Sequence, residues 1–118
     1  ITRRLYLSNP DTMGGYPQAA KTFAQNRGIA CIDMYKYSTE LLSSLGDEKS
    51  KELYLWLDAK DSRYMSDPQY AADSNKLRDT VQTDNSHFTY YGARIFASEI
   101  ARQLGEKFSS LAGSIKKN

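Results

Sequence analysis

One short apolar run between two helical patterns most constrains how this chain folds. Residues 29–33 have the sequence Ile-Ala-Cys-Ile-Asp, which is too short for a helix, and they follow Gly28, so the pattern predicts a short buried strand. The order helix, strand, helix predicts an α/β layer architecture with a parallel sheet. Such a sheet needs several strands buried on both faces, whereas the sequence offers one convincing strand and a possible second. We therefore expect the other strands to come from sequence outside this chain or from a companion chain.

The N-terminal half predicts two helices around that strand. Residues 1–7 are partly apolar and could end a strand, before a loop marked by proline and paired glycines. A helix is expected over residues 17–28, because proline suits its first position and glycine suits its stop. A second helix is expected to end at Gly46, and a further helical segment is expected from there to about Leu57. The second helix has leucines at positions 41, 42 and 45 on one face.

The C-terminal half predicts a long loop and one clear helix. Residues 58–83 are rich in aspartate and show no sustained period, so we expect a long surface loop, for which both a role facing the active site or a substrate and a disordered segment are open. The last helix has apolar residues at three- or four-residue steps, so one of its faces must pack on other elements. These apolar positions are Phe96, Ile100, Leu104, Phe108 and Leu111.

The composition is that of one ordinary globular domain. The 118 residues are 40% hydrophobic and 25% charged, which favours neither a disordered nor a fibrous chain. The net charge of +2 is spread along the chain and gives no case for a nucleic-acid partner. No apolar stretch approaches the roughly 20 residues that span a bilayer, so we expect no membrane insertion. The single cysteine, Cys31, allows no intrachain disulfide and is expected to be buried packing.

The start of the chain bears on what is expected of it. The sequence opens with Ile-Thr-Arg-Arg, without an initiator methionine or a signal segment. We expect a processed or truncated piece, so the lack of a targeting signal leaves the localisation unknown.

The only histidine, His87, lies three residues after Asp84 and just before the last helix. Histidine can take and return a proton near neutral pH, and a carboxylate on its other ring nitrogen fixes the tautomer and stabilises the imidazolium. The spacing therefore predicts an acid–base pair presented by a loop. The structural alternative is a pair that only braces the start of the helix.

The sequence around this pair resembles a known family. Residues 84–93, Asp-Asn-Ser-His-Phe-Thr-Tyr-Tyr-Gly-Ala, resemble the last conserved block of the SGNH, or GDSL, hydrolases. Upstream segments in the same order and at similar spacing resemble the rhamnogalacturonan acetylesterase branch, so the resemblance covers nearly the whole chain. These segments are Thr2-Arg3-Arg4, Gly15-Tyr16-Pro17, Gly28-Ile29-Ala30-Cys31-Ile32-Asp33-Met34, Leu45-Gly46 and Leu55-Trp56-Leu57.

The resemblance implies both a fold and an activity. It implies that residues 1–118 are the C-terminal portion of a single three-layer α/β/α, flavodoxin-like domain with a parallel sheet. It also implies a carbohydrate acetylesterase that hydrolyses acetyl esters on pectic polysaccharides such as rhamnogalacturonan, with no metal or organic cofactor. His87 and Asp84 would be two members of a Ser-His-Asp catalytic triad. An extracellular or periplasmic location follows from the resemblance only.

One large departure from the family concerns the nucleophile. The family's serine lies in an N-terminal Gly-Asp-Ser block and its oxyanion glycine and asparagine lie in later blocks, all upstream of the region matched here. Gly46-Asp47-Glu48 is no substitute, because its third residue has no hydroxyl group. Ser86 has no nucleophilic role in the family. We therefore expect the isolated chain to be inactive and to need the N-terminal portion of the enzyme, which could be a companion chain.

Several residues are candidates for binding or support. Arg3 and Arg4 could bind acidic sugars, although basic residues near a chain end are more often solvated. Tyr64 could stack on a sugar ring, and core packing is the favoured role for Trp56. Asn85 and Thr89 could hydrogen-bond around the Asp-His turn, or Thr89 could simply cap the helix. The tyrosines at positions 90 and 91 could shape the edge of the site or pack under it.

Two alternative functions remain open. The same fold could act on another ester, such as a lipid or a xylan acetate, since a fold does not dictate its substrate. Alternatively, the chain could be a noncatalytic interaction module. Upstream sequence would distinguish the second alternative, because a Gly-Asp-Ser block there would support the enzyme.

Overall fold

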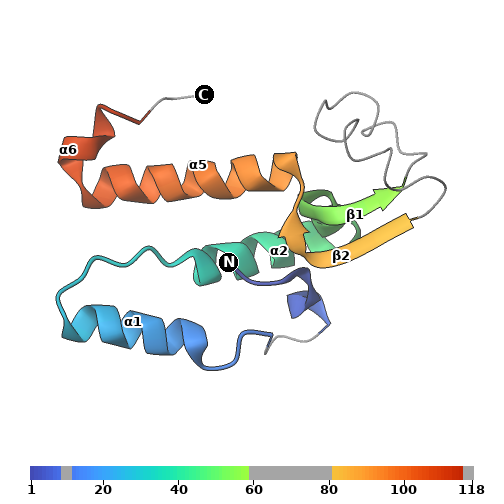
Figure 1. Ribbon diagram of the computed structural model, residues 1–118, viewed down its shortest axis with the longest axis horizontal. Coiled ribbons are helices and arrows are strands. Elements are labelled where there is room, and N and C mark those ends of the chain that lie inside the picture. Colours follow the sequence, from blue (N-terminus) through green and yellow to red (C-terminus); the bar gives the residue numbers. More distant parts are fainter. Residues whose placement is uncertain (9–11, 59–80, 116–118) are drawn as a thin grey trace.

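The computed structural model describes residues 1–8, 12–58 and 81–115. The described residues form a mixed α/β structure that is mostly helical, with one small sheet (Figure 1). In chain order the elements are η1 (Arg4–Leu7), α1 (Tyr16–Asn26), α2 (Met34–Ser50), η2 (Lys51–Leu53), β1 (Tyr54–Asp58), β2 (Val81–Phe88), α5 (Tyr90–Lys107) and α6 (Ser109–Ala112).

The sheet differs from the expected one. The prediction was a parallel sheet, whereas among the described residues β1 and β2 pair antiparallel in two strands. Their pairing is supported by side-chain contact, since the rings of Tyr54 and Phe88 meet edge to face with centroids 5.4 Å apart. The expected helical segment to about Leu57 is therefore wrong beyond residue 53, because residues 54–58 are extended and lie in β1.

The strand expected at residues 29–33 is also wrong. These residues are neither helix nor strand, and Ile29 is 56% exposed. A buried parallel strand needs a neighbouring strand on each side, and none lies beside this segment in the part of the chain that the structure describes. Cys31 is half-buried rather than fully enclosed.

The predicted helices are found with small shifts at their ends. Helix α1 begins at Tyr16 with proline in its first turn, and α5 covers the apolar repeat as far as Lys107. Helix α2 bends at Gly46, where φ is 72°, so the predicted stop at this glycine is confirmed as a kink that separates two helical stretches.

Two other expected segments need correction. Residues 4–7 form a single turn of 3-10 helix, η1, instead of a strand end. The loop expected over 58–83 has its first residue in β1 and its last three in β2, while residues 59–80 lie outside the described residues.

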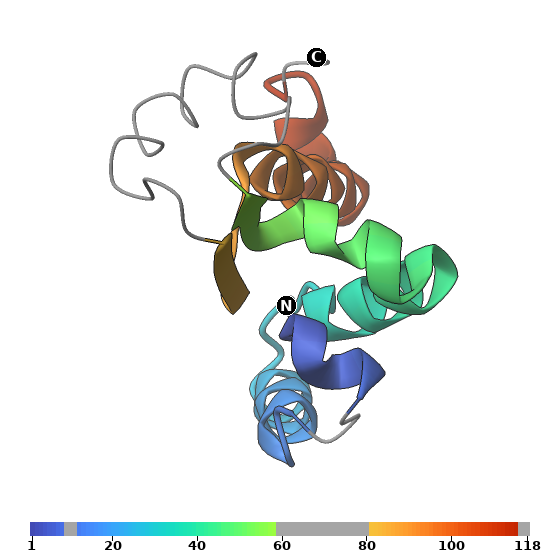
Figure 2. The same cartoon turned by 90° about the vertical axis from the view of Figure 1, so that its right-hand side faces the viewer.

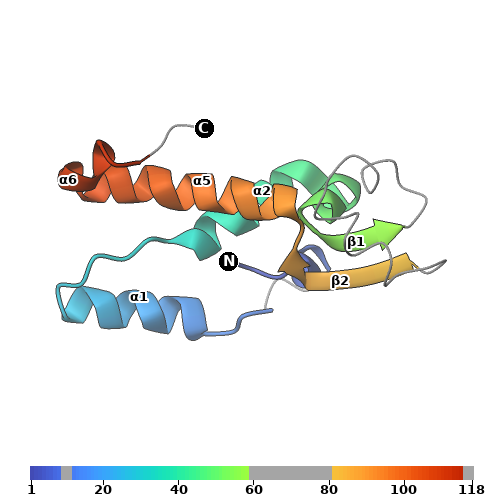
Figure 3. The same ribbon diagram turned by 45° about the horizontal axis from the view of Figure 1, so that its top comes forward.

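The core is small and lies where α2, η2, β1 and α5 meet. Figure 2 shows α5 nearly end-on above α2, with η1 and α1 on the opposite side. Figure 3 shows α6 beside the far end of α5, away from the sheet. The buried hydrophobic cluster consists of Met34, Leu42, Leu53, Tyr54 and Phe96. The chain has a radius of gyration of 16.6 Å, compared with about 13–14 Å for a compact domain of this length, so its architecture is open.

None of the helices within the described ranges is long and apolar enough to cross a membrane.

Candidate active site

The candidate acid–base pair lies in a bulge of β2. Trp56 pairs with Thr83 and Tyr54 pairs with Phe88, so the four residues 84–87 of β2 lie opposite the single residue Leu55 of β1. The extra residues have no place in the ladder and must leave the line of the strand. The sequence predicted a loop here, and the structure places the same residues in an irregular strand in which Ser86 and His87 are exposed while Asp84 and Asn85 are half-buried.

Asp84 and His87 are in direct contact across this bulge. Asp84 Oδ1 accepts hydrogen bonds from the backbone N–H of Ser86 at 2.7 Å and of His87 at 2.9 Å, which closes a tight turn. Asp84 Oδ2 lies 2.8 Å from His87 Nδ1. An ionised carboxylate only accepts hydrogen bonds, so Nδ1 carries a proton, and in the neutral ring Nε2 is then the acceptor.

The environment keeps Asp84 ionised. Partial burial acts to raise the pKa of Asp84, but the backbone N–H groups of His87 and Ser86, together with the His87 ring, outweigh it and lower the pKa below its usual value. The Asp84 side chain is 25% exposed and that of His87 is 76% exposed. The pair therefore combines a held carboxylate with a largely accessible imidazole.

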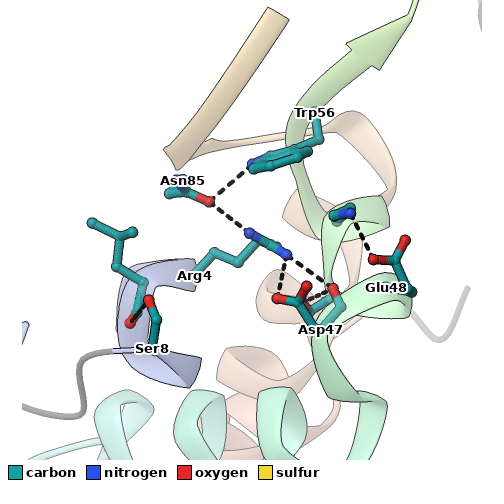
Figure 4. Close-up of polar contacts among 9 residues, drawn as sticks. Arg4, Ser8, Asp47, Glu48, Trp56 and Asn85 are labelled. Atoms are coloured by element: carbon teal, nitrogen blue, oxygen red, sulfur yellow. Dashed lines mark hydrogen bonds and ion pairs between the residues drawn. The ribbon is translucent and has the colours of Figure 1, made fainter.

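Asn85 ties the bulge to the rest of the molecule. Its Oδ1 accepts hydrogen bonds from Trp56 Nε1 at 2.9 Å and from Arg4 Nη1 at 3.0 Å (Figure 4). The Trp56 ring packs against the hydrophobic core, as predicted, and the Arg4 guanidinium lies over it at 4.4 Å from the ring centroid.

Arg4 is buried and has a second partner on α2. Its Nη2 donates to Asp47 Oδ1 at 2.6 Å and to the Asp47 carbonyl oxygen at 3.0 Å (Figure 4). The Arg4 side chain is only 7% exposed, and its charge is paired with the Asp47 carboxylate, whose side chain is 67% exposed. The kink at Gly46 immediately precedes Asp47, at the point of α2 that faces η1. The role of Arg4 in binding sugar stays a prediction.

Arg3 also contacts the bulge, from the exposed side. Its Nε donates to Ser86 Oγ at 2.8 Å. Among the described residues, no hydrogen bond joins Ser86 Oγ to the His87 ring. A sugar-binding role for Arg3 likewise stays a prediction.

The junction between the bulge and α5 is fixed by Thr89 and Gly92. Thr89 Oγ1 accepts from the Gly92 N–H at 2.9 Å and donates to the Glu52 carbonyl at 2.7 Å, so the predicted capping role of Thr89 is confirmed. A Cβ atom on Gly92 would lie 2.1 Å from the Leu53 carbonyl oxygen. Only glycine allows this close approach of α5 to η2, so the contact fixes the start of the helix that follows His87 in the chain.

The other candidate residues do not join this site. Tyr64 lies outside the described residues. Tyr90 and Tyr91 are half-exposed and line an open hollow of about 670 Å³ along α5 that neither Asp84 nor His87 lines. Among the described residues, no group of three or more histidine, cysteine or acidic residues could hold a metal ion.

Sequence reasoning missed the link from Asp47 through Arg4 to the bulge. In the sequence, Asp47 is visible only as a possible helix cap and as the middle residue of Gly46-Asp47-Glu48, which fails as a nucleophile block because Glu48 has no hydroxyl group. The three residues of this link lie 43 and 81 positions apart, and no local pattern connects positions at such distances.

The comparisons with known proteins give one distant relation. No protein-family model matches the chain. No solved structure matches it. The chain is 30% identical over 109 residues to rhamnogalacturonan acetylesterase RhgT of Bacillus subtilis (strain 168), in a match that covers 90% of this chain and 41% of that relative. The chain is thus a distant homologue of a rhamnogalacturonan acetylesterase, as its sequence patterns predicted, and spans about two fifths of the relative's length.

Proposed function

We propose that this chain, a distant homologue of a rhamnogalacturonan acetylesterase, supplies the acid and base of a serine esterase that removes acetyl groups from a pectic polysaccharide. The observation that carries the proposal is the 2.8 Å contact between Asp84 Oδ2 and His87 Nδ1, in a histidine whose side chain is largely exposed. A histidine that only braced a helix would not need its second ring nitrogen accessible.

The chemistry follows from the roles of these two groups. His87 Nε2 takes the hydroxyl proton as a serine attacks the acetyl carbonyl, and it returns that proton to the sugar oxygen as the C–O bond breaks. The imidazole then takes a proton from the water that attacks the acetyl-serine, and returns this proton to the serine oxygen as the acetyl group leaves as acetic acid, which ionises to acetate. Asp84 stays ionised throughout, holds the Nδ1 proton and stabilises the imidazolium. Donors that face the developing oxyanion complete the site.

The nucleophile in this proposal comes from outside these 118 residues. Ser86 has its hydroxyl group engaged with Arg3 and no bond to the His87 ring. The proposed complete domain is a three-layer α/β/α fold with a parallel sheet, in which this chain joins a nucleophile-bearing N-terminal portion. Support comes from the match to two fifths of the relative and from exposed apolar residues such as Phe23 and Ile29, which are 59% and 56% exposed.

A chimera tests the proposal. In the Bacillus subtilis relative, the matched region is replaced by this chain, and acetate release from acetylated rhamnogalacturonan is measured after folding has been checked by circular dichroism. We expect release above background, and a loss of roughly a thousandfold in kcat for His87→Ala and for Asp84→Asn in the chimera.

Two controls sharpen the result. Ser86→Ala in the chimera should keep its activity, because Ser86 is not the proposed nucleophile. The chain alone should not hydrolyse para-nitrophenyl acetate above the rate of the buffer. A folded chimera that releases no acetate, or turnover by the chain alone that His87→Ala abolishes, would contradict the proposal.

A further inference from the structure

The contacts of the bulge assign Arg4 a role other than sugar binding. We propose that Arg4 is a positioning residue that, through Asn85, holds His87 in the tautomer with its proton on Nδ1. The inference rests on the proposed function, because that tautomer matters only if Nε2 acts as a base. Arg4 does not touch substrate in this role, and the tautomer of His87 can be measured without turnover.

The Arg4 guanidinium bridges two acceptors that lie on different elements. Arg4 Nη1 and Nη2 point in different directions, one to Asn85 Oδ1 at 3.0 Å and the other to Asp47 at 2.6 Å. A planar fork of this kind bridges two fixed acceptors at once, which a single ammonium group does poorly. Arg4 thereby connects α2 to the bulge of β2 while its face lies over Trp56.

Two donors fix the orientation of the Asn85 side chain. Both contacts of its Oδ1 come from donors, Trp56 Nε1 and Arg4 Nη1, so the oxygen and not the amide nitrogen must face them. With both donors in place the side chain cannot rotate without losing two hydrogen bonds. Arg4 supplies one of them from a buried position, where competition from water is weak.

The turn that contains Asn85 also positions Asp84 against His87. Asn85 lies between Asp84 and Ser86, and the Ser86 N–H donates to Asp84 Oδ1. Fixing Asn85 therefore fixes the turn that aims Asp84 Oδ2 at His87 Nδ1. The His87 ring is largely exposed, and Asp84 is its hydrogen-bond partner among the described residues, so the tautomer depends on how well this turn is held.

Nuclear magnetic resonance tests the inference directly, because His87 is the only histidine and its ring ¹⁵N signals need no assignment. The ratio of the Nδ1–H to the Nε2–H tautomer is measured in the full 118-residue chain, at a pH where the ring is neutral. We expect the Nδ1–H form to predominate. Arg4→Lys and Asn85→Ala should each lower the ratio by about tenfold, the scale of one hydrogen bond to a charged group.

A matched control separates positioning from general stabilisation. Lys51 also lies over the Trp56 ring, at 4.8 Å, but its Nζ donates to Glu48 Oε1, so Lys51→Ala should leave the ratio unchanged. The double variant of Arg4 and Asn85 should match the single variants, since both act along one path. If Arg4→Lys does not fold, Asn85→Ala decides, because it leaves the contact between Arg4 and Asp47 in place.

The outcomes are distinct. An unchanged tautomer ratio in a folded Arg4→Lys or Asn85→Ala chain, even with lower stability, would overturn the inference. A changed ratio together with a folded but inactive chimera would support the positioning role and contradict only the proposed function.

Discussion

Helices α1 and α5 are both amphipathic, yet α5 buries a large aromatic side chain of its apolar face, whereas the one buried residue of α1 is the small Ala24. Phe96 of α5 is 2% exposed and meets the rings of Tyr37 and Phe88, whereas Phe23 of α1 is 59% exposed. Helix α5 packs on η2, α2 and β2, while α1 makes no extensive contact with another element in the described part of the chain. The ion pair of Lys21 with Asp33, at 2.7 Å, joins α1 to the start of α2.

The difference shows that the spacing of apolar residues along a helix predicts which face can be buried, but not whether another element covers that face. The anchored region, defined as η2, β1, β2 and α5, combines hydrophobic packing with buried hydrogen bonds such as that from Tyr54 Oη to the Thr2 carbonyl at 2.6 Å. Burial raises the pKa of Tyr54, so its hydroxyl stays protonated and keeps donating. The open region, α1 with residues 27–33, relies on surface interactions, each of which contributes little.

The largest contrast is expected between two phenylalanines. Phe96→Ala should lower the free energy of unfolding by about 3–5 kcal/mol, because it leaves a cavity in the core. Phe23→Ala should change it by less than about 0.5 kcal/mol. Urea unfolding followed by circular dichroism measures both. Equal losses for the two variants would show that α1 is as well anchored as α5.

A smaller effect is expected at the close approach of α5 to η2. Gly92→Ala should lower the free energy of unfolding by about 1–3 kcal/mol, since the added methyl group meets the Leu53 backbone. Gly113→Ala is the matched control, because nothing lies within 4 Å of its added Cβ atom and its φ is −73°. Comparable unfolding midpoints for Gly92→Ala and the unchanged chain would disprove the close approach.

The smallest effect concerns two aspartates, one in each region. Asp84 and Asp33 both have a pKa below the usual value; for Asp33 the main cause is the hydrogen bond from Lys21. A lowered folded-state pKa contributes stability above the unfolded value of about 3.9, and this contribution is lost as the pH falls through the folded-state pKa. The stability gap between the unchanged chain and Asp84→Asn, or Asp33→Asn, should be less than about 1 kcal/mol at neutral pH.

That gap should close on acidification. Urea unfolding at about pH 6 and about pH 2.5 measures it, because a protonated aspartate resembles asparagine in charge. A gap that stays constant over this range would show that neither carboxylate is stabilised by its charge in the folded state.

The sequence could predict features that depend on neighbouring positions. Helices α1 and α5, the kink at Gly46 and the cap at Thr89 all follow from local spacing and capping. The contact between Asp84 and His87 belongs to the same class, since the two residues are only three positions apart in sequence. Each of these features needs only a few residues in sequence, and each was found.

Features that depend on distant partners could not be predicted. The apolar pattern of residues 29–33 implies burial, but a strand forms only beside another strand. The pairing of β2 with β1 could not be predicted, because residues 84–87 do not alternate between apolar and polar side chains as a half-buried strand does. Arg4 was expected near solvent, and its burial depends on Asp47 and Asn85, far along the chain.

The link between Arg4 and Asn85 also has a consequence for folding. It joins residues 81 positions apart, and closing a flexible loop of that length costs about 4 kcal/mol in chain entropy by the logarithmic scaling alone. The turn of Asp84 and His87 can form in a short peptide, but its anchoring must wait until the N-terminal segment that contains Arg4 meets β2. The acid–base pair should therefore gain its final orientation late in folding, when the long-range contacts form.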